Sequence, residues 1–204
     1  MRNACLSPAL IFAAAAATAA PADDLLVFVG EKQTVEQFQP KASPDEIRMD
    51  SAFRATYAIR QIVFGDFKAA TIAFDAYDHY GRPAFERYKF ALLFVSLVDG
   101  VYYQQKYQFF PVFQLGSGEW AGCGDPYQYE PRVHRGKLVA RKLTYGADAF
   151  FEISDLSSRD LAARYPAPYY EIKQGKAFCR MGNTVQELFE VKKNGVLKAR
   201  GLFE

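Results

Sequence analysis

The sequence predicts a mainly β protein: a small antiparallel barrel, followed by a further β-rich segment with one or two short helices. Phe, Tyr, Val and Ile recur at alternate positions along most of the chain, which is the period of a half-buried strand. Turn dipeptides such as Asp99-Gly100 separate these runs. Half of the residues are apolar and 16% are aromatic, a composition that excludes disordered and low-complexity classes.

The first 22 residues have the layout of a secretory signal peptide. Arg2 is their only charged residue, and it precedes an apolar segment from Leu6 to Ala17 and small residues up to Ala22. That segment is shorter than the roughly 20 apolar residues of a membrane span. We therefore expect residues 1–22 to be removed, with no transmembrane segment in the mature chain, and the protein to be exported to the periplasm or the extracellular space.

Removal of the signal peptide leaves 182 residues with a net charge of +1 and two cysteines. The near balance of acidic and basic side chains gives no net field to attract phosphates, so we expect no nucleic-acid partner. An even pair of cysteines in an exported chain indicates one disulfide, between Cys123 and Cys179. The two are 56 positions apart and neither belongs to a Cys-x-x-Cys motif, which disfavours a catalytic or metal-binding thiol pair.

The first half of the mature chain predicts three strands before a hairpin. Residues 25–29 form a short apolar run, and residues 53–59 and 72–76 alternate between apolar and polar side chains. The alternation breaks near Gln61, which indicates a β-bulge. Between the first two strands, Ser43-Pro-Asp-Glu46 has the form of a capping box and predicts a helical turn.

The strongest local signal is a hairpin of residues 91–98 and 101–109. Its turn, Asp99-Gly100, suits both left-handed positions of a type I′ turn. A two-residue loop pairs residues whose numbers add to 199, so Phe94 is expected to face Gln105. Both faces of this pair are partly apolar, which is typical of strands inside a barrel or sandwich.

The order of these segments carries a resemblance to a known family. The segments are Leu26-Val-Phe-Val-Gly30, Phe53-Arg-Ala-Thr-Tyr-Ala-Ile59 running into Val63-Phe-Gly65, Thr71-Ile-Ala-Phe74, and Ala91-Leu-Leu-Phe-Val95. Over residues 25–113 the chain resembles the netrin-like module, which is also found in tissue inhibitors of metalloproteinases. The resemblance implies an OB-like β-barrel over residues 23–115. It implies no protease inhibition, because those inhibitors use an N-terminal cysteine pair and residues 23–75 contain no cysteine.

The second half predicts a Gly/Pro-rich connecting loop over residues 116–130 and a β-rich C-terminal part over residues 131–204 that packs on the barrel. Ser157 can cap a short helix that ends before Pro166. Asn194-Gly195 predicts a second hairpin, of residues 185–193 with 196–203. Further strands are expected at residues 137–145, 150–153, 169–172 and 177–181.

The candidate metal site is a group of titratable side chains around His79. Asp75, Asp78 and Glu86 are its neighbours in the sequence, and carboxylates together with an imidazole are ligands that zinc accepts. On an extended segment Asp75 and His79 point to the same side. An exported metal-binding protein or metal-dependent enzyme centred on His79 is therefore the alternative hypothesis. His134, flanked by arginines, is interpreted as a surface residue.

The leading hypothesis is a non-catalytic binding protein that needs no cofactor. The chain contains neither a Gly-x-Ser-x-Gly motif nor a P-loop. We expect a protein, peptide or glycan partner, bound through an aromatic surface. A third hypothesis is a barrel that holds an apolar ligand in an internal cavity of roughly 300 Å³ or more. The residues expected on the aromatic surface are Tyr102, Trp120, Tyr127 and Tyr129.

Overall fold

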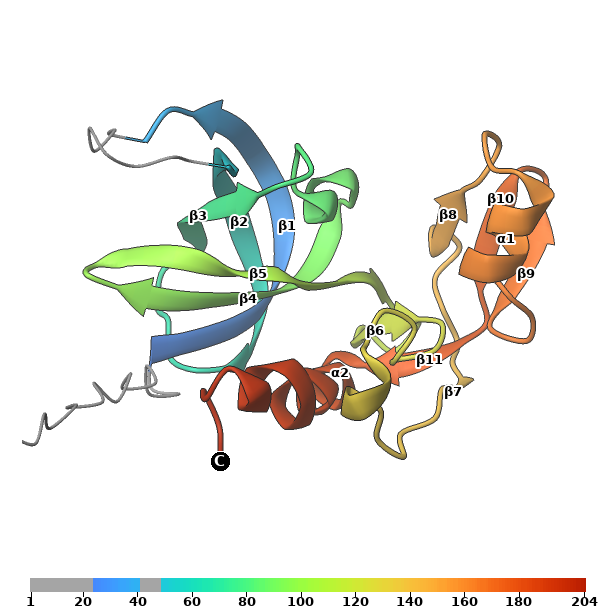
Figure 1. Cartoon of the computed structure of the whole chain (residues 1–204). Helices are drawn as coiled ribbons and strands as arrows, with labels where there is room; N and C mark the ends of the chain where they lie inside the picture. The colour runs from blue at the N-terminus through green and yellow to red at the C-terminus, as the bar shows by residue number, and fades with distance from the viewer. Residues whose placement is uncertain (1–23, 41–48) are drawn as a thin grey trace, which may run out of the picture.

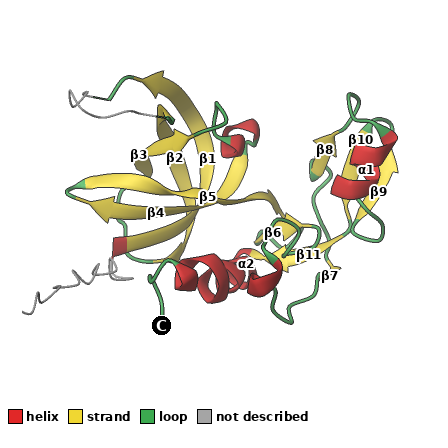
Figure 2. Cartoon of the chain, viewed as in Figure 1, coloured by secondary structure: helices red, strands yellow, loops and turns green. Residues whose placement is uncertain are grey.

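The structure is a computed structural model that describes residues 24–40 and 49–204 (Figure 1). The expected signal peptide and the helical turn expected from Ser43 lie outside the described residues. A five-stranded barrel is followed by a C-terminal part that has its own three-stranded sheet (Figure 2). The predicted fold class is confirmed: an OB-like barrel, then a further β-rich segment with two short α-helices.

The barrel is a ring in which each strand is hydrogen-bonded to the next. β3 and β5 pair in parallel and close the ring, whereas the other pairs are antiparallel. The bulge predicted near Gln61 is confirmed, because Val29 pairs with Gln61 but Gly30 pairs with Ile59. In ring order the strands are β1 (Leu25–Phe38), β2 (Ser51–Phe64), β3 (Thr71–Asp78), β5 (Val101–Gln114) and β4 (Phe90–Val98).

The barrel interior is filled with apolar side chains. Phe28, Tyr57 and Phe74 are at most 1% exposed. Phe85, from the 3₁₀ helix η2 (Ala84–Arg87), packs against the Phe74 ring with centroids 5.8 Å apart. Because these side chains occupy the interior, the hypothesis of an apolar ligand inside the barrel has no support in the described part of the chain.

The end of the chain covers the outer face of β1 and β4. The covering elements are α2 (Val185–Lys192) and the π-helical turn η4 (Lys193–Leu197), which lie below the barrel in Figure 1. Phe189 of α2 belongs to the same buried cluster as Val27 of β1 and Phe94 of β4. The two strands are therefore buried on both faces, with the barrel interior on one side and the helical segment on the other.

The predicted hairpin of residues 185–193 and 196–203 is wrong, because this segment is helical. Thr184 and Glu187 form a capping box: the Glu187 carboxylate accepts hydrogen bonds from the Thr184 N–H at 2.8 Å and from its hydroxyl at 3.0 Å. Val185, Leu188 and Phe189 are buried, which is a helical period and not an alternation. Gly195 lies inside η4, where its non-helical dihedral angles kink the helix instead of turning a hairpin.

The β4–β5 hairpin is confirmed at its turn but has a different register beyond it. The pairs from Val98 with Val101 to Val95 with Gln104 follow the expected register, whereas Leu93 pairs with Phe109. This shift of three residues arises at a bulge that contains Tyr107, whose φ is 66°. An odd shift exchanges the two faces of a strand, so the predicted pairing of Phe94 with Gln105 is wrong and Phe109 packs against the barrel core instead.

The C-terminal part consists of short elements. β6 continues the barrel sheet from β5, and β11 joins β6 to β7, so the segment expected to be only a connecting loop contributes a strand. Between residues 137 and 145 only β7 is regular. A second sheet has the order β8-β10-β9. The strands are β6 (Trp120–Cys123), β7 (Arg141–Lys142), β8 (Phe150–Glu152), β9 (Tyr170–Lys173), β10 (Lys176–Cys179) and β11 (Met181–Thr184).

Two local predictions in this part are confirmed. The helix α1 (Ser158–Arg164) begins at Ser157, whose hydroxyl accepts the Asp160 N–H at 3.2 Å. The disulfide joins Cys123 at the end of β6 to Cys179 at the end of β10, with 5.6 Å between the Cα atoms. It therefore ties the three-stranded sheet to the extension of the barrel sheet. No helix of residues 24–40 and 49–204 is both long and apolar enough to cross a membrane.

Candidate binding groove

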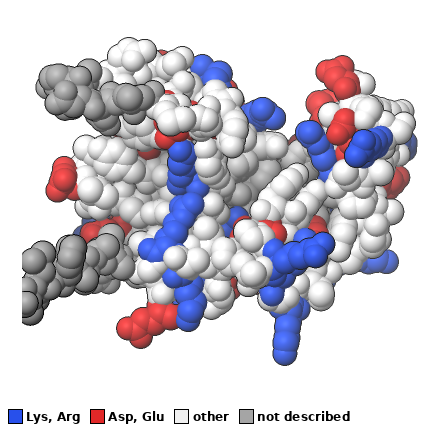
Figure 3. All heavy atoms as spheres, viewed as in Figure 1, with Lys and Arg blue, Asp and Glu red and all other residues white. Residues whose placement is uncertain are grey.

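A groove of about 530 Å³ lies between the barrel and the C-terminal part. Residues of η2 and β5 line its barrel side, residues of α1 and β8 line the opposite side, and residues of α2 contribute to its floor. Ligand sites commonly have volumes of roughly 300–1,000 Å³. In Figure 3, Lys or Arg side chains stand on either side of the hollow between the barrel and the three-stranded sheet.

The walls of the groove are connected by four aromatic rings, which we call the aromatic row: Phe109, Tyr88, Phe151 and Tyr165. Successive ring centroids are 6.0, 6.0 and 5.4 Å apart. The row begins on β5 and ends just beyond α1, so it crosses from the barrel to the small sheet. All four side chains are half-buried and line the groove, which leaves part of their apolar surface available to a ligand.

Local structure fixes the middle and the far end of the aromatic row. Phe151 is the central residue of β8 and pairs with Ala177 of β10. Tyr165 follows the last residue of α1, and its N–H donates to the Leu161 carbonyl at 2.8 Å. Tyr88 follows η2 directly, and its N–H donates to the Phe85 carbonyl at 3.2 Å. Each ring is therefore held by a backbone that is itself hydrogen-bonded.

Two arginines line the groove from opposite sides. Arg87 is the last residue of η2 on the barrel, and Arg164 is the last residue of α1. Both are exposed. Neither guanidinium has an ion pair or a side-chain hydrogen bond within residues 24–40 and 49–204. Each is therefore free to interact with a ligand.

The tyrosine hydroxyls of the row are protonated at neutral pH. Burial is the main cause that raises the pKa of Tyr88, with a smaller effect from Tyr129, against the opposing effects of Arg87 and Arg164. Burial likewise raises the pKa of Tyr165 to about 12. Both hydroxyls can therefore donate a hydrogen bond to a ligand in the groove.

The floor of the groove holds a buried ion pair. The side chains of Lys192 and Glu130 are 6% and 4% exposed, and the Lys192 ammonium donates to the Glu130 carboxylate. The ammonium also lies 4.8 Å from the centroid of the Phe110 ring. Burial lowers the pKa of Lys192 against the opposing effect of Glu130. His134 Nδ1 lies 3.7 Å from Glu130 and is buried without a hydrogen-bond partner among the described residues, so it is not the solvated surface group that the sequence suggested.

The carboxylates of the predicted metal site have other partners. Asp75 accepts two hydrogen bonds from Arg54, at 2.8 and 3.0 Å. Glu86 accepts one from Arg82 at 2.5 Å. Asp78 accepts the backbone N–H that lies two residues further on, at 2.8 Å. Asp75 and Glu86 are therefore each neutralised by an arginine, and Asp78 serves a turn.

His79 lies near a carboxylate that the sequence did not single out. Its Nδ1 is 3.6 Å from Asp50 Oδ1 and 3.1 Å from the Met49 carbonyl oxygen. Asp50 also forms an ion pair with Lys106, at 2.5 Å. In the part of the chain that the structure describes, no group of three or more His, Cys, Asp or Glu residues could hold a metal ion. The metal-centred alternative therefore finds no support in this geometry.

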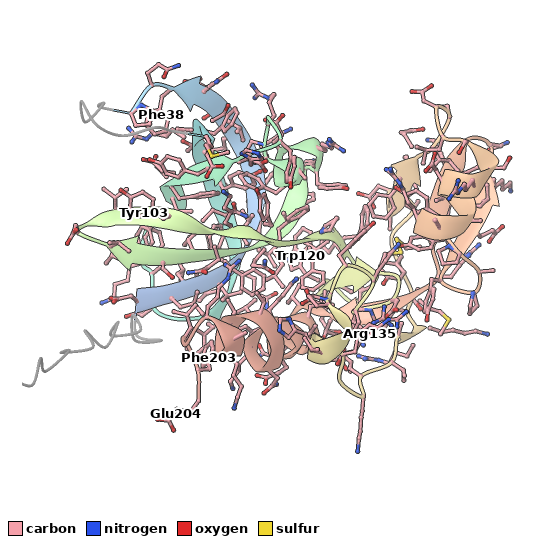
Figure 4. All side chains as sticks on the ribbon, in the orientation of Figure 1. Phe38, Tyr103, Trp120, Arg135, Phe203 and Glu204 are labelled. Atoms are coloured by element: carbon pink, nitrogen blue, oxygen red, sulfur yellow. A yellow bond between two sulfur atoms is a disulfide. The ribbon has the colours of Figure 1, made fainter. Side chains whose placement is uncertain are left out.

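The predicted aromatic surface is not assembled as one patch. Trp120 and Tyr127 are only 8% and 7% exposed. Trp120 lies at the junction between the barrel and the C-terminal part (Figure 4), where it packs on the Phe90 ring at 4.7 Å. Tyr102 packs on a phenylalanine of the β2–β3 connection at 5.7 Å. Tyr129, which is 80% exposed, is the member of the predicted set that lines the groove.

Sequence reasoning missed Arg87, Tyr88, Phe151, Arg164 and Tyr165. These residues come from elements far apart in the chain and match no motif. Comparisons of the chain with protein-family models, with curated proteins and with solved structures found no match in any of the three. The function must therefore be argued from the groove itself.

Proposed function

We propose that this protein is an exported, non-catalytic binding protein whose ligand occupies the groove between the barrel and the small sheet. The aromatic row is the observation that carries this proposal. Half-buried rings in a concave site, bordered by a few polar groups, offer apolar surface and orientation together. The barrel interior is already filled, whereas this groove is a concave, largely apolar site to which a ligand has access in the described structure.

Two features support the exported state. The first 22 residues have the charge and hydropathy pattern of a signal peptide. Cys123 and Cys179 are joined in a disulfide, a bond that persists in oxidising compartments. Both features are expected of a protein of the periplasm or the extracellular space.

The polar groups of the groove support binding and not catalysis. Cys123 lines the groove but is held in the disulfide, so it presents no thiolate nucleophile. Lys192 and Glu130 neutralise each other on the floor. The lining also offers apolar ring surface, tyrosine hydroxyls and guanidinium groups, which are groups that hold a ligand in place.

Tyr129→Ala tests the proposal, because this side chain lines the groove yet is too exposed to be needed for folding. The purified chain is screened against defined sets of peptides, glycans and small aromatic compounds. For any ligand found, we expect Tyr129→Ala to weaken binding by roughly tenfold in a calorimetric titration.

Tyr80→Ala is the matched control, because Tyr80 is 87% exposed and does not line the groove. It should bind as tightly as the unchanged chain. The proposal is overturned if no compound in the three sets binds, or if the ligands found bind Tyr129→Ala and the unchanged chain equally well.

A further inference from the structure

Two positive charges in the groove are not neutralised by an acidic side chain of the described residues. Among the acidic residues that line it, Glu130 is paired with Lys192. Asp125 accepts the Tyr127 N–H at 2.9 Å and lies 3.5 Å from Arg135, which is outside the lining. The remaining acid, Asp78, accepts a backbone N–H. The cations with no acidic partner in the described lining are therefore Arg87 and Arg164.

Both guanidinium groups line the same groove as the aromatic row, Arg87 from the barrel side and Arg164 from the side of α1. Arg87 and Arg164 both act electrostatically on the Tyr88 hydroxyl, and Arg164 also acts on that of Tyr165. The two hydroxyls have no hydrogen-bond partner among the described residues. The mouth of the groove thus combines two planar cationic donors with two O–H donors. Arginine forks match a carboxylate geometrically, and hydrogen bonds between ionised groups are stronger than neutral ones.

The aromatic row and the two arginines also indicate the uncharged part of the ligand. Tyr88 is a member of the aromatic row, follows Arg87 directly in the chain and lines the groove together with Arg164. A group that stacks on the row or meets it edge-on therefore places its own substituents beside the guanidiniums. Aromatic pairs prefer such offset or edge-to-face contacts, at centroid distances of roughly 4.5–7 Å. The volume of about 530 Å³ is that of a small-molecule site.

We infer that the groove binds a small aromatic carboxylate, with its ring against the aromatic row and its carboxylate between Arg87 and Arg164. This inference rests on the proposed function, since it names the ligand class of the same groove. The ion pair on the floor, Lys192 with Glu130, contributes no net charge, so it does not compete for the carboxylate. The ligand is accordingly held by apolar contact along its ring and by charge at the groove mouth.

The test compares two probes of the same shape, 2-naphthoate and the uncharged 2-naphthamide, titrated into the purified chain. We expect the acid to bind at least roughly tenfold more tightly than the amide. Arg87→Gln and Arg164→Gln should each remove most of that preference while leaving the affinity for the amide unchanged. Raising the salt concentration should weaken binding of the acid alone.

Arg159→Gln is the matched control, because Arg159 lies on the same helix as Arg164, is exposed and does not line the groove. It should keep the preference for the acid. Equal affinity of the two probes, or an equal loss in Arg159→Gln, overturns the inference. A peptide with a free C-terminal phenylalanine that binds far more tightly than 2-naphthoate would also overturn it, because the occupant would then be a chain terminus.

Failure of the inference can be told from failure of the proposed function. If both probes bind equally and Tyr129→Ala weakens both, the groove binds ligands but does not select for charge. If neither probe binds and the peptide and glycan sets are also negative, the proposed function fails as well. Both readouts come from the folded protein, whose thermal unfolding midpoint is measured for every variant.

Discussion

The barrel and the C-terminal part are stabilised in different ways. The barrel strands are 8 to 14 residues long and close into a ring, so their backbone groups are paired and their side chains form one interior. The strands of the C-terminal part are 2 to 4 residues long. They depend on the disulfide and on ring contacts such as Tyr165 with Tyr170, at 5.1 Å. The barrel wall of the groove is therefore formed by a closed sheet. The opposite wall consists of short elements that depend on a disulfide and on aromatic contacts.

The most direct test of this difference compares the stability lost in Phe74→Ala, in the barrel, with that lost in Phe178→Ala, in the small sheet. Phe74 is 1% exposed and contacts the rings of Tyr57 and Phe85, so its truncation should lower the free energy of unfolding by about 3–5 kcal/mol. Phe178 is half-buried and contacts one ring, that of Phe150, so its truncation should have less than half that effect. Urea denaturation of both variants measures the difference, and equal losses would refute it.

Replacing both cysteines by serine should affect the two parts unequally. The disulfide spans 56 positions, and loss of such a cross-link destabilises a domain by about 2–4 kcal/mol. Because the bond joins β6 to β10, hydrogen exchange should accelerate in β8, β9 and β10 while β1 to β4 remain protected. Uniform acceleration across the chain would show instead that the two parts unfold together.

Glu187→Gln should have the smallest effect, at about 0.5–1 kcal/mol at neutral pH, because the Glu187 side chain is 31% exposed. Partial burial acts to raise the pKa of Glu187, but the Arg141 guanidinium and hydrogen bonds from Thr184 outweigh it and hold the pKa below its ordinary value of 4.5. The stabilisation is therefore present above that value and lost as the pH falls through the lowered pKa.

Urea unfolding midpoints at pH 7 and pH 3 test whether the stabilisation by Glu187 is lost as the pH falls. The gap between the unchanged chain and Glu187→Gln should narrow at pH 3, because protonation of Glu187 weakens both the ion pair and the capping box. A gap of the same size at both values would mean that the charge of Glu187 contributes nothing to the stability of α2. The result bears on how the two parts are stabilised, because α2 is the element through which the C-terminal part covers the barrel.

Local patterns were sufficient to place the barrel strands but not for their full length or register: β1 was expected over residues 25–29 and extends to Phe38. Alternation over residues 53–59 and the turn at Asp99-Gly100 are local, and the structure follows both. The bulge that contains Tyr107 is not signalled locally, and it inverts the faces beyond it. In the segment of α2 and η4, two local patterns of the sequence oppose each other. The capping box of Thr184 and Glu187 determines the structure, whereas the Asn-Gly signal does not.

The groove could not be predicted in the same way, because it is produced by tertiary packing. Tyr88 precedes β4 of the barrel and Phe151 belongs to β8 of the small sheet, so tertiary packing brings the two rings into contact. Of the aromatic residues selected from the sequence, Tyr129 lies in the groove, whereas Trp120 and Tyr127 are buried elsewhere. Aromatic content alone does not separate core positions from ligand-binding positions, since the same residue types serve both.

The position of α2 and η4 after the barrel strands in the sequence has a consequence for how the protein matures. The five barrel strands all precede residue 115, whereas the elements that cover the outer side of β1 and β4 follow residue 184 and are made later. A growing chain can therefore complete its ring while Val27 and Phe94 still face water. Until α2 and η4 have been made, that surface is open to other unfinished chains, and a polypeptide that stops before α2 would be prone to self-association.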